Sequence, residues 1–290
     1  MSEPKDLKDS KNLKSPEMPA SDPARIPPPV PAPLDEAAIR ARLTRPCDLQ
    51  VLEVTGSTND VAKTASLTGR PFVCLANHQT AGRGRKGRAF ESPAGTGFYI
   101  SFAISVPEAS LPQVTTVTMA AAVAVARAVE QVLGLRPGIK WVNDLFLDGK
   151  KSCGILTEAD PAPGGLVRLV PGIGVNCFPG SFPPELSAVA GSLADRVDAF
   201  DRSELAAALI NEMLAVLEDP GDKGFLADYR KRCFILGRDI SVHPTPANSP
   251  LDESGRRAHA LAVTDDGGLL VRWPDGREEA LHSGEVSIRL

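Results

Sequence analysis

The run GFYISFAISV, residues 97–106, places the strongest constraint on the fold of this chain. Large apolar side chains alternate with smaller or polar ones throughout the run. A period of two puts successive side chains on opposite faces of the backbone, so the run predicts a strand with two unlike faces. The chain therefore builds a sheet around this strand.

Helical and strand-like segments surround this run in an irregular order. Residues 113–133, rich in Ala and Val and followed by Gly134, predict a mostly buried helix with a glycine C-cap. Ser57 or Thr58 opens another helix, Ser203 caps a third, and Gly149 lies in a tight turn. Further helices are predicted at 35–43, 203–218 and 222–233, and further strands at 50–54, 72–77, 139–148, 152–158 and 166–177. The region is mixed α and β.

Both ends of the chain differ from this mixed region. Residues 1–34 alternate Lys with Asp and then become proline-rich, which predicts a disordered tail. After Cys233, five short strands separated by turn residues predict a small antiparallel barrel, with a boundary near Leu236. The predicted parts are a tail over 1–34, a mixed α and β domain over 35–236 and a barrel over 237–290.

The overall charge argues against a surface coated with cations for nucleic acid. The 290 residues contain 32 Lys and Arg against 36 Asp and Glu, a net charge of -4. Five scattered cysteines form no metal-binding cluster, which indicates a reducing compartment without structural zinc. No membrane span or signal peptide is evident, so we expect a cytoplasmic protein.

Residues 78–97 contain a basic, glycine-rich loop. Four cations lie within 83–88 without an apolar residue among them: Arg83, Arg85, Lys86 and Arg88. Such a loop gains little from packing, so we expect it to be mobile until an anion organises it. The pattern formally matches GxGxxG, but turn residues follow where a dinucleotide-binding fold needs a helix. The alternative is a solvated basic loop or a nucleic-acid patch.

Residues 140–158 form a second segment in which charged and polar side chains gather. They are Lys140, Asn143, Asp144, Lys150 and Lys151, spread over a predicted strand, turn and strand. Alternate side chains of paired strands can converge on one sheet face. Lysines there could neutralise a carboxylate and a phosphate, and Asp144 could hold Mg²⁺. The alternative is an ordinary hairpin with lysines in its turn.

Five motifs occur in a fixed order: GSTND (56–60), HQTAGRGRKGR (78–88), KWVNDLFLDGKKSCGIL (140–156), GIGVN (172–176) and GEVSIRL (284–290). Together they resemble the biotin–protein ligases, from about residue 40 to the end. The resemblance implies an α+β fold, with a mixed sheet flanked by helices as in class II aminoacyl-tRNA synthetases, followed by an SH3-like barrel. It also implies a two-step reaction in which biotin and MgATP give biotinyl-5′-AMP, and a carrier-domain lysine then takes the biotinyl group.

The resemblance also implies site residues. The essential, catalytic residues are Lys151, which bridges the biotin carboxylate and the α-phosphate, and Arg85, which retains the adenylate. The biotin-binding set is Ser57, Thr58, Asn59, Gln79, Gly82, Arg83, Arg85, Lys151, Gly154 and Gly172. The ATP-binding set is Arg85, Arg88, Phe90, Asn143, Lys151 and Asn176. Asp144 is the metal-side carboxylate, and no tightly bound prosthetic group is expected.

Several of these residues have structural alternatives. Ser57 could serve only as a helix cap. We expect Trp141 to be a core residue rather than one that stacks on adenine, and His78 to be a loop residue with its hydrogen bonds satisfied rather than a catalytic base. Val142 stands where the family usually has Pro, which restores a backbone donor and predicts a slight change in strand geometry. The family's N-terminal winged-helix domain has no counterpart here, so we expect a monofunctional ligase without a DNA partner.

The resemblance implies an acceptor, the biotin carrier domain of acetyl-CoA carboxylase or a related carboxylase. Homodimers are common in the family, and we see no independent signal for one. The nearest chemical alternative is a lipoate or octanoate ligase or transferase of related fold. A different class of alternative is a nucleic-acid-binding protein that uses residues 83–88, which predicts a steeply salt-dependent affinity.

Overall fold

The computed structural model describes residues 32–111, 116–180, 182, 186, 188–197, 200–243, 255–282 and 285–288. Contacts divide the chain into Met1–Val30 and Pro31–Leu290, and the second unit is described below. The predicted disordered tail, residues 1–34, lies outside the described residues except for 32–34.

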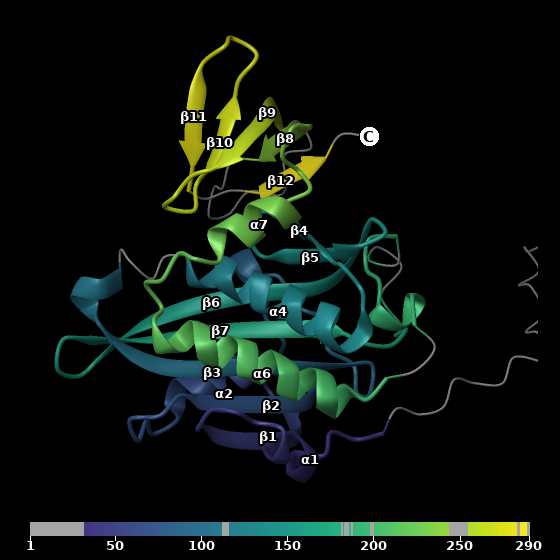
Figure 1. The fold of residues 1–290 in the computed structure, drawn as a ribbon, viewed down its shortest axis with the longest axis vertical. Helices are drawn as coiled ribbons and strands as arrows, with labels where there is room; N and C mark the ends of the chain where they lie inside the picture. Colours follow the sequence, from purple (N-terminus) through teal and green to yellow (C-terminus); the bar gives the residue numbers. More distant parts are fainter. Residues whose placement is uncertain are drawn as a thin grey trace, which may run out of the picture. The chain divides into compact units, whose positions relative to one another are not determined.

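A seven-stranded mixed sheet forms the centre of the second unit (Figure 1). Its strands lie in the order β1-β2-β3-β7-β6-β5-β4, with β1 parallel to β2 and every other pair antiparallel. The strands are β1 Asp48–Thr55, β2 Phe72–Gln79, β3 Gly97–Pro107, β4 Gly138–Lys140, β5 Asp144–Leu147, β6 Lys150–Ala162 and β7 Leu166–Asn176. The predicted α+β architecture with a mixed sheet is confirmed.

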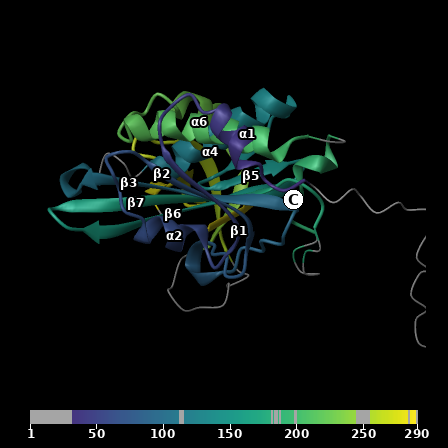
Figure 2. The ribbon, with the colours of Figure 1, turned by 90° about the horizontal axis from the view of Figure 1, so that it is seen from below.

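Helices cover both faces of this sheet (Figure 2). One face carries α4 and α6, which pack against each other, and the other carries α2, which contacts β2, β3 and β7. Most of α4 is buried because its Ala and Val side chains fit between α6 and the sheet. The helices are α1 Glu36–Ala41, α2 Thr58–Thr64, α4 Val117–Leu133, α6 Arg202–Glu218 and α7 Leu226–Arg232, with short 3₁₀ turns η1 Arg85–Gly87, η2 Glu108–Ser110 and η3 Leu193–Asp195.

The strand predicted at 97–106 is β3, and both of its faces are buried. Only its far end is exposed, because α2 covers one face and the opposite helix layer covers the other. Ser101, on the face with the smaller side chains, has no exposed surface. The faces are unlike in composition, as predicted, but neither meets solvent along the centre of the strand.

Two local predictions were wrong. The single strand expected at 139–148 is two short strands, β4 and β5, joined by a turn at 141–143. Val142 therefore lies in a turn rather than in a strand, and the Trp141–Val142 peptide is cis. Asp201, not Ser203, caps α6: its Oδ1 accepts from Ser203 N at 2.8 Å. The predicted cap at Gly134 is confirmed, with φ of 68°.

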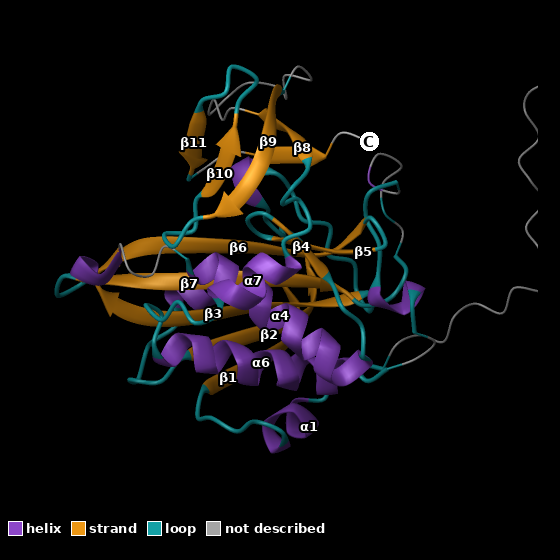
Figure 3. Ribbon diagram, turned by 45° about the horizontal axis from the view of Figure 1, so that its top comes forward, coloured by secondary structure: helices purple, strands orange, loops and turns teal. Residues whose placement is uncertain are grey.

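The C-terminal strands form a separate five-stranded antiparallel sheet (Figure 3). They are β8 Asp239–His243, β9 Arg256–Val263, β10 Leu269–Arg272, β11 Glu278–Leu281 and β12 Glu285–Ile288, in the order β11-β10-β9-β8-β12. Trp141, 5% exposed, donates from Nε1 to Gly267 O at 3.0 Å, so it is a core residue as predicted. The domain boundary near Leu236 stays a prediction.

Among the described residues, none of the helices is both long enough and apolar enough to span a membrane.

Candidate functional site

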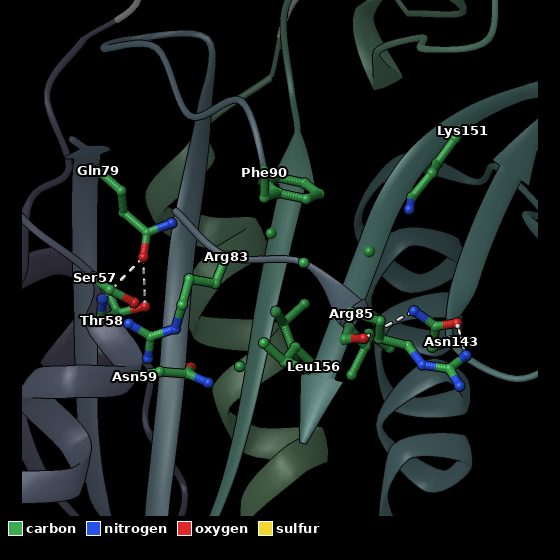
Figure 4. Close-up of a pocket in the computed structure, with 16 residues that line it drawn as sticks. Ser57, Thr58, Asn59, Gln79, Arg83, Arg85, Phe90, Asn143, Lys151 and Leu156 are labelled. Carbon is green, nitrogen blue, oxygen red and sulfur yellow. Dashed lines mark hydrogen bonds between the residues drawn. The ribbon is translucent and has the colours of Figure 1, made fainter. Parts of the chain in front are cut away.

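A pocket lies above the centre of β6 and β7, on the sheet face that carries α2 (Figure 4). Its open volume is about 50 Å³, well below the roughly 300–1,000 Å³ of ligand sites, so side chains must move before a ligand enters. The lining residues are Ser57, Thr58, Asn59, Gln79, Arg83, Gly84, Arg85, Phe90, Asn143, Lys151, Gly154, Ile155, Leu156, Gly172, Ile173 and Gly174.

Most of the site residues expected from the motifs meet in this pocket. Eleven of them line it: Ser57, Thr58, Asn59, Gln79, Arg83, Arg85, Phe90, Asn143, Lys151, Gly154 and Gly172. Four others do not belong to the lining: Gly82, Arg88, Asp144 and Asn176. Segments separated by more than 100 positions in the sequence therefore form one site.

The start of α2 and the end of β2 build the polar half of the pocket. Ser57 occupies the N-cap position of α2, but its side chain makes no capping hydrogen bond. Gln79 Oε1 accepts from Thr58 N at 2.9 Å and lies 3.0 Å from Thr58 Oγ1, while Gln79 Nε2 donates to Ser92 Oγ at 3.1 Å. Ser57 is thus not held as a helix cap, and its hydroxyl belongs to the pocket lining.

A second layer of hydrogen bonds lies behind this half. Ser101 Oγ is 2.7 Å from Thr58 Oγ1 and 2.5 Å from Asn59 Oδ1, and Asn59 Nδ2 donates to Glu158 Oε2 at 2.6 Å. The sequence-based expectation did not include Ser101 or Glu158. The sequence feature that could have identified them is the period of two in the strands. Ser101 lies on the polar side of β3, and Glu158 shares a strand face with Gly154 and Leu156.

Ion pairs surround the same layer. The Arg83 guanidinium donates to both oxygens of Asp60 at 2.7 Å and to Glu158 at 3.2 Å. Its hydrogen bonds hold the pKa of Asp60 below the ordinary value. Lys63 binds Glu158 at 2.7 Å and Asp160 at 3.3 Å. Arg83, expected to await an anionic ligand, is held by protein carboxylates.

The other half of the pocket is cationic. Arg85 Nη1 donates to Asn143 Oδ1 at 3.2 Å, and Asn143 Nδ2 donates to Ile155 O at 2.9 Å. Lys151 Nζ lies 2.7 Å from Asp144 Oδ1, so the expected metal-side carboxylate is ion-paired with the expected essential lysine. In the part of the chain that the structure describes, no group of three or more His, Cys, Asp or Glu could hold a metal ion.

The basic loop closes on itself. Gly84 N donates to Arg88 O at 2.7 Å and Phe90 N donates to Gly82 O at 2.9 Å. Gly87 has φ of 71°, the left-handed conformation that glycine adopts at no steric cost. A Cβ on Gly82 would lie 2.6 Å from Ser92 Oγ, so the loop needs glycine at its first position. The expected ordering of this loop by ligands stays a prediction.

Phe90 lies between the two halves of the pocket (Figure 4). A Cβ on Gly154 would be 2.9 Å from Phe90 Cε2, and one on Gly174 would be 2.6 Å from Phe90 Cζ. The ring therefore uses the space that these two glycines leave. Movement of Phe90 would enlarge the pocket at its centre.

Three further residues named from the sequence have structural roles or positions that the structure defines. A Cβ on Gly172 would overlap the Asn59 amide, so this glycine makes room for Asn59. Asn176 Nδ2 donates to Gly191 O at 3.2 Å and Lys151 O at 3.4 Å, which ties β7 to β6. His78 lies in β2, not in a loop as expected.

Comparison with known proteins gives the class first. The model of the biotin/lipoate A/B protein ligase family matches residues 51–176, which hold four of the five motifs. The bifunctional ligase/repressor BirA of Bacillus subtilis is 34% identical over 246 residues, covering 81% of this chain and 72% of that protein.

Two further relatives narrow the class. The biotin--[acetyl-CoA-carboxylase] ligase of Mycobacterium tuberculosis is 31% identical over 268 residues, covering 88% of this chain and 95% of that protein. The biotin protein ligase from Aquifex aeolicus in complex with biotin and ATP superposes with a TM-score of 0.65 at 25% identity, over 83% of this chain and 98% of that one. This chain belongs to the biotin–protein ligase family, and the predicted family, fold class and enzyme class are confirmed.

Proposed function

We propose that this protein activates biotin with ATP and transfers it to a lysine of a carrier domain. The observation that carries the proposal is the division of one pocket into a hydrogen-bonding polar half and a cationic half. Biotin has a neutral ureido ring at one end and a carboxylate at the other, so its two ends match the two halves. In ATP, the α-phosphate would meet the carboxylate at the cationic half.

The polar half would bind the ureido ring. Ser57, Thr58, Asn59 and Gln79 offer hydroxyl and amide groups that can donate to the ureido oxygen and accept from its N–H groups. Arg83, Gly82 and Gly172 would complete the wall of the pocket around the ureido ring. Because these side chains are already fixed by hydrogen bonds to one another, binding would cost little rearrangement there.

The cationic half would assist two bond changes. A biotin carboxylate oxygen attacks the α-phosphorus of ATP and pyrophosphate leaves; the amine of an acceptor lysine then attacks the acyl carbon, AMP leaves and an amide forms. Lys151 would leave Asp144 and neutralise the carboxylate and α-phosphate as they approach, because two anions repel each other. Arg85 would retain the adenylate, with Arg88, Phe90, Asn143 and Asn176 on the nucleotide side of the pocket.

Mg²⁺ would enter with ATP, and the carboxylate we propose to hold it is Asp144, which is paired with the lining residue Lys151. Mg²⁺ commonly binds through one or two carboxylates together with substrate phosphates, so a single aspartate fits this pattern. Asp144 Oδ1 is buried, and its ion pair with Lys151 must open before it serves a metal. The metal would neutralise phosphate charge, and Lys151 would be released by the same exchange of partners.

The acceptor we propose is the biotin carrier domain of acetyl-CoA carboxylase or a related carboxylase. Relatives from Mycobacterium tuberculosis and Paracoccus denitrificans, each 31% identical, carry the name biotin--[acetyl-CoA-carboxylase] ligase. The lack of a DNA partner stays a prediction, and the sequence leaves the choice between monomer and homodimer open.

Exchange of labelled pyrophosphate into ATP tests the proposed function. We expect exchange that requires biotin and does not occur with lipoate or octanoate in its place. Exchange with lipoate alone would instead identify a lipoate ligase. Steeply salt-dependent binding of DNA or RNA, lost on replacing the four loop cations and accompanied by no exchange, would favour the nucleic-acid alternative.

A further inference from the structure

Three side chains, two of them from the pocket lining, converge on the carboxylate of Glu158, which does not itself line the pocket. Its Oε2 accepts from Asn59 Nδ2 at 2.6 Å and Arg83 Nη2 at 3.2 Å, and its Oε1 accepts from Lys63 Nζ at 2.7 Å. Burial opposes ionisation, but these hydrogen bonds outweigh it and hold the pKa of Glu158 below the ordinary value. Glu158 is therefore an ionised acceptor at neutral pH.

An ionised carboxylate only accepts hydrogen bonds, so it fixes the orientation of the Asn59 amide. The Asn59 Nδ2 group must face Glu158, and Oδ1 must face Ser101 Oγ at 2.5 Å. Because Oδ1 is an acceptor, Ser101 must donate its hydroxyl hydrogen to it. A hydroxyl carries one hydrogen, so Ser101 cannot also donate to Thr58 Oγ1, 2.7 Å away.

The same reasoning orients the Thr58 hydroxyl. Its hydrogen has two acceptors within the protein, Ser101 Oγ and Gln79 Oε1. Gln79 is itself oriented, because its Nε2 donates to Ser92 Oγ, which donates to Phe90 O at 2.8 Å. Because Ser101 does not donate to Thr58, the 2.7 Å contact between the two hydroxyl oxygens requires the Thr58 hydrogen. That hydrogen therefore points to Ser101, and the Thr58 oxygen meets the pocket with a lone pair, as an acceptor.

We propose that Glu158 is a positioning residue for biotin, acting through Asn59 and Ser101 to keep Thr58 as an acceptor for a ureido N–H. The inference rests on the proposed function. If the Asn59 amide turned over, Nδ2 would face Ser101, and the Ser101 hydrogen would turn to Thr58. The Thr58 hydrogen, released from Ser101, could then point into the pocket and face the ureido N–H, where an acceptor is required. Glu158 prevents this reversal because it cannot donate to Asn59 Oδ1.

A purely structural role for Glu158 can be separated from this one. Removing its carboxylate leaves both neighbouring cations with another partner, because Lys63 keeps Asp160 at 3.3 Å and Arg83 keeps Asp60 at 2.7 Å. The ion pairs that α2 makes through Asp60 and Lys63 therefore remain. Lys63 and Arg83 thus each keep a carboxylate partner in Glu158→Ala, whereas Asn59 Nδ2 loses the acceptor that orients it.

The test is a double-mutant comparison in the pyrophosphate exchange assay at saturating ATP. We expect Glu158→Ala to raise the KM for biotin about 10- to 100-fold, the effect of losing a hydrogen bond to a charged group, with kcat and the KM for ATP little changed. In a Ser101→Ala background the relay to Thr58 is already cut, so adding Glu158→Ala should change the biotin KM less than about threefold. Asp160→Asn, which alters the other carboxylate paired with Lys63, is the matched control and should leave the biotin KM unchanged.

Glu158→Gln tests the same point if the alanine variant does not fold. Its single carbonyl oxygen must serve either Asn59 or Lys63, so we expect a severalfold rise in the biotin KM that again disappears with Ser101→Ala. An unchanged biotin KM in Glu158→Ala, or an equal rise with and without Ser101, would overturn the inference while leaving the ligase function intact. Absence of biotin-dependent exchange in the wild-type protein would overturn the proposed function, and the positioning role with it.

Discussion

The two halves of the pocket differ in how far they are prepared for a ligand. In the polar half, Thr58, Asn59, Gln79 and Ser101 are connected by hydrogen bonds of 2.5 to 3.0 Å and are fixed by neighbours outside the pocket. In the cationic half, Lys151 is paired with Asp144, and Arg85 makes a longer contact of 3.2 Å with Asn143.

We infer that the two substrates bind to different kinds of site. Biotin is neutral at its ureido end and is recognised by geometry, which a prebuilt network supplies at low entropic cost. ATP brings charge, which can displace Asp144 from Lys151. We therefore expect substitutions in the polar half to act on biotin affinity and those in the cationic half to act on chemistry.

The largest effect should come from Lys151→Ala. Without its charge the carboxylate and α-phosphate repel each other as they approach, and Asp144 adds a further negative charge. We expect a loss of pyrophosphate exchange of at least about 100- to 1,000-fold, with biotin binding by calorimetry changed far less. Lys150→Ala is the matched control, since Lys150 is exposed and does not line the pocket. A loss of the same size in both variants would contradict the assignment.

The next effect should come from Arg85→Gly, which we expect to act on the intermediate. Losing charged hydrogen bonds to the adenylate should speed its release about 10- to 100-fold. Released biotinyl-5′-AMP would label lysines of unrelated proteins, which blotting with streptavidin measures. Retention of the adenylate as tight as in the wild-type protein would show that another group holds it.

Gly172→Ala should weaken the polar half by about tenfold or more in biotin affinity, without abolishing the chemical step. A Cβ at this position would overlap the Asn59 amide, which must then leave its place between Ser101 and Glu158. Gly56→Ala is the control, because its Cβ would meet no atom within 4 Å. If Gly172→Ala instead lowered kcat at unchanged biotin KM, the division of the pocket would be wrong.

The smallest effect should come from Ser57→Ala. Its hydroxyl makes no capping bond in the protein, so we expect folding stability to be nearly unchanged and biotin affinity to fall about three- to tenfold. Thermal unfolding and calorimetric titration measure the two quantities. A clear fall in melting temperature without loss of affinity would return Ser57 to a capping role.

Local signals in the sequence predicted the sheet, whereas the residues expected in the pocket came from the resemblance of the five motifs to the biotin–protein ligases. Strand β3 shows a period of two, α4 is rich in Ala and Val, and the motif residues lie on elements whose ends meet. For the partners Ser101 and Glu158, the period of two indicates a strand face but not which side chains they contact. Asn59 and Glu158 are 99 positions apart, and their contact follows from the pairing of β6 with β7 and the packing of α2 on the sheet.

Other features depended on choices between competing local structures. Ser203 and Asp201 are both good N-cap residues, and only the packing of α1 against α6 engages the Ser203 hydroxyl with Asp35 N. The reversal at 141–143 interrupts a run whose composition suits one strand. The place of Phe90 between two glycines of different strands could not be read from its neighbours in sequence.

Hydrogen–deuterium exchange tests the difference between the two halves most directly. The account predicts that amides of α2 and the centre of β3 exchange slowly without ligand and change little on adding biotin and ATP, whereas residues 82–91 gain strong protection only when both are present. Equal protection of both regions, or a loop that exchanges alike with and without the ligands, would contradict it.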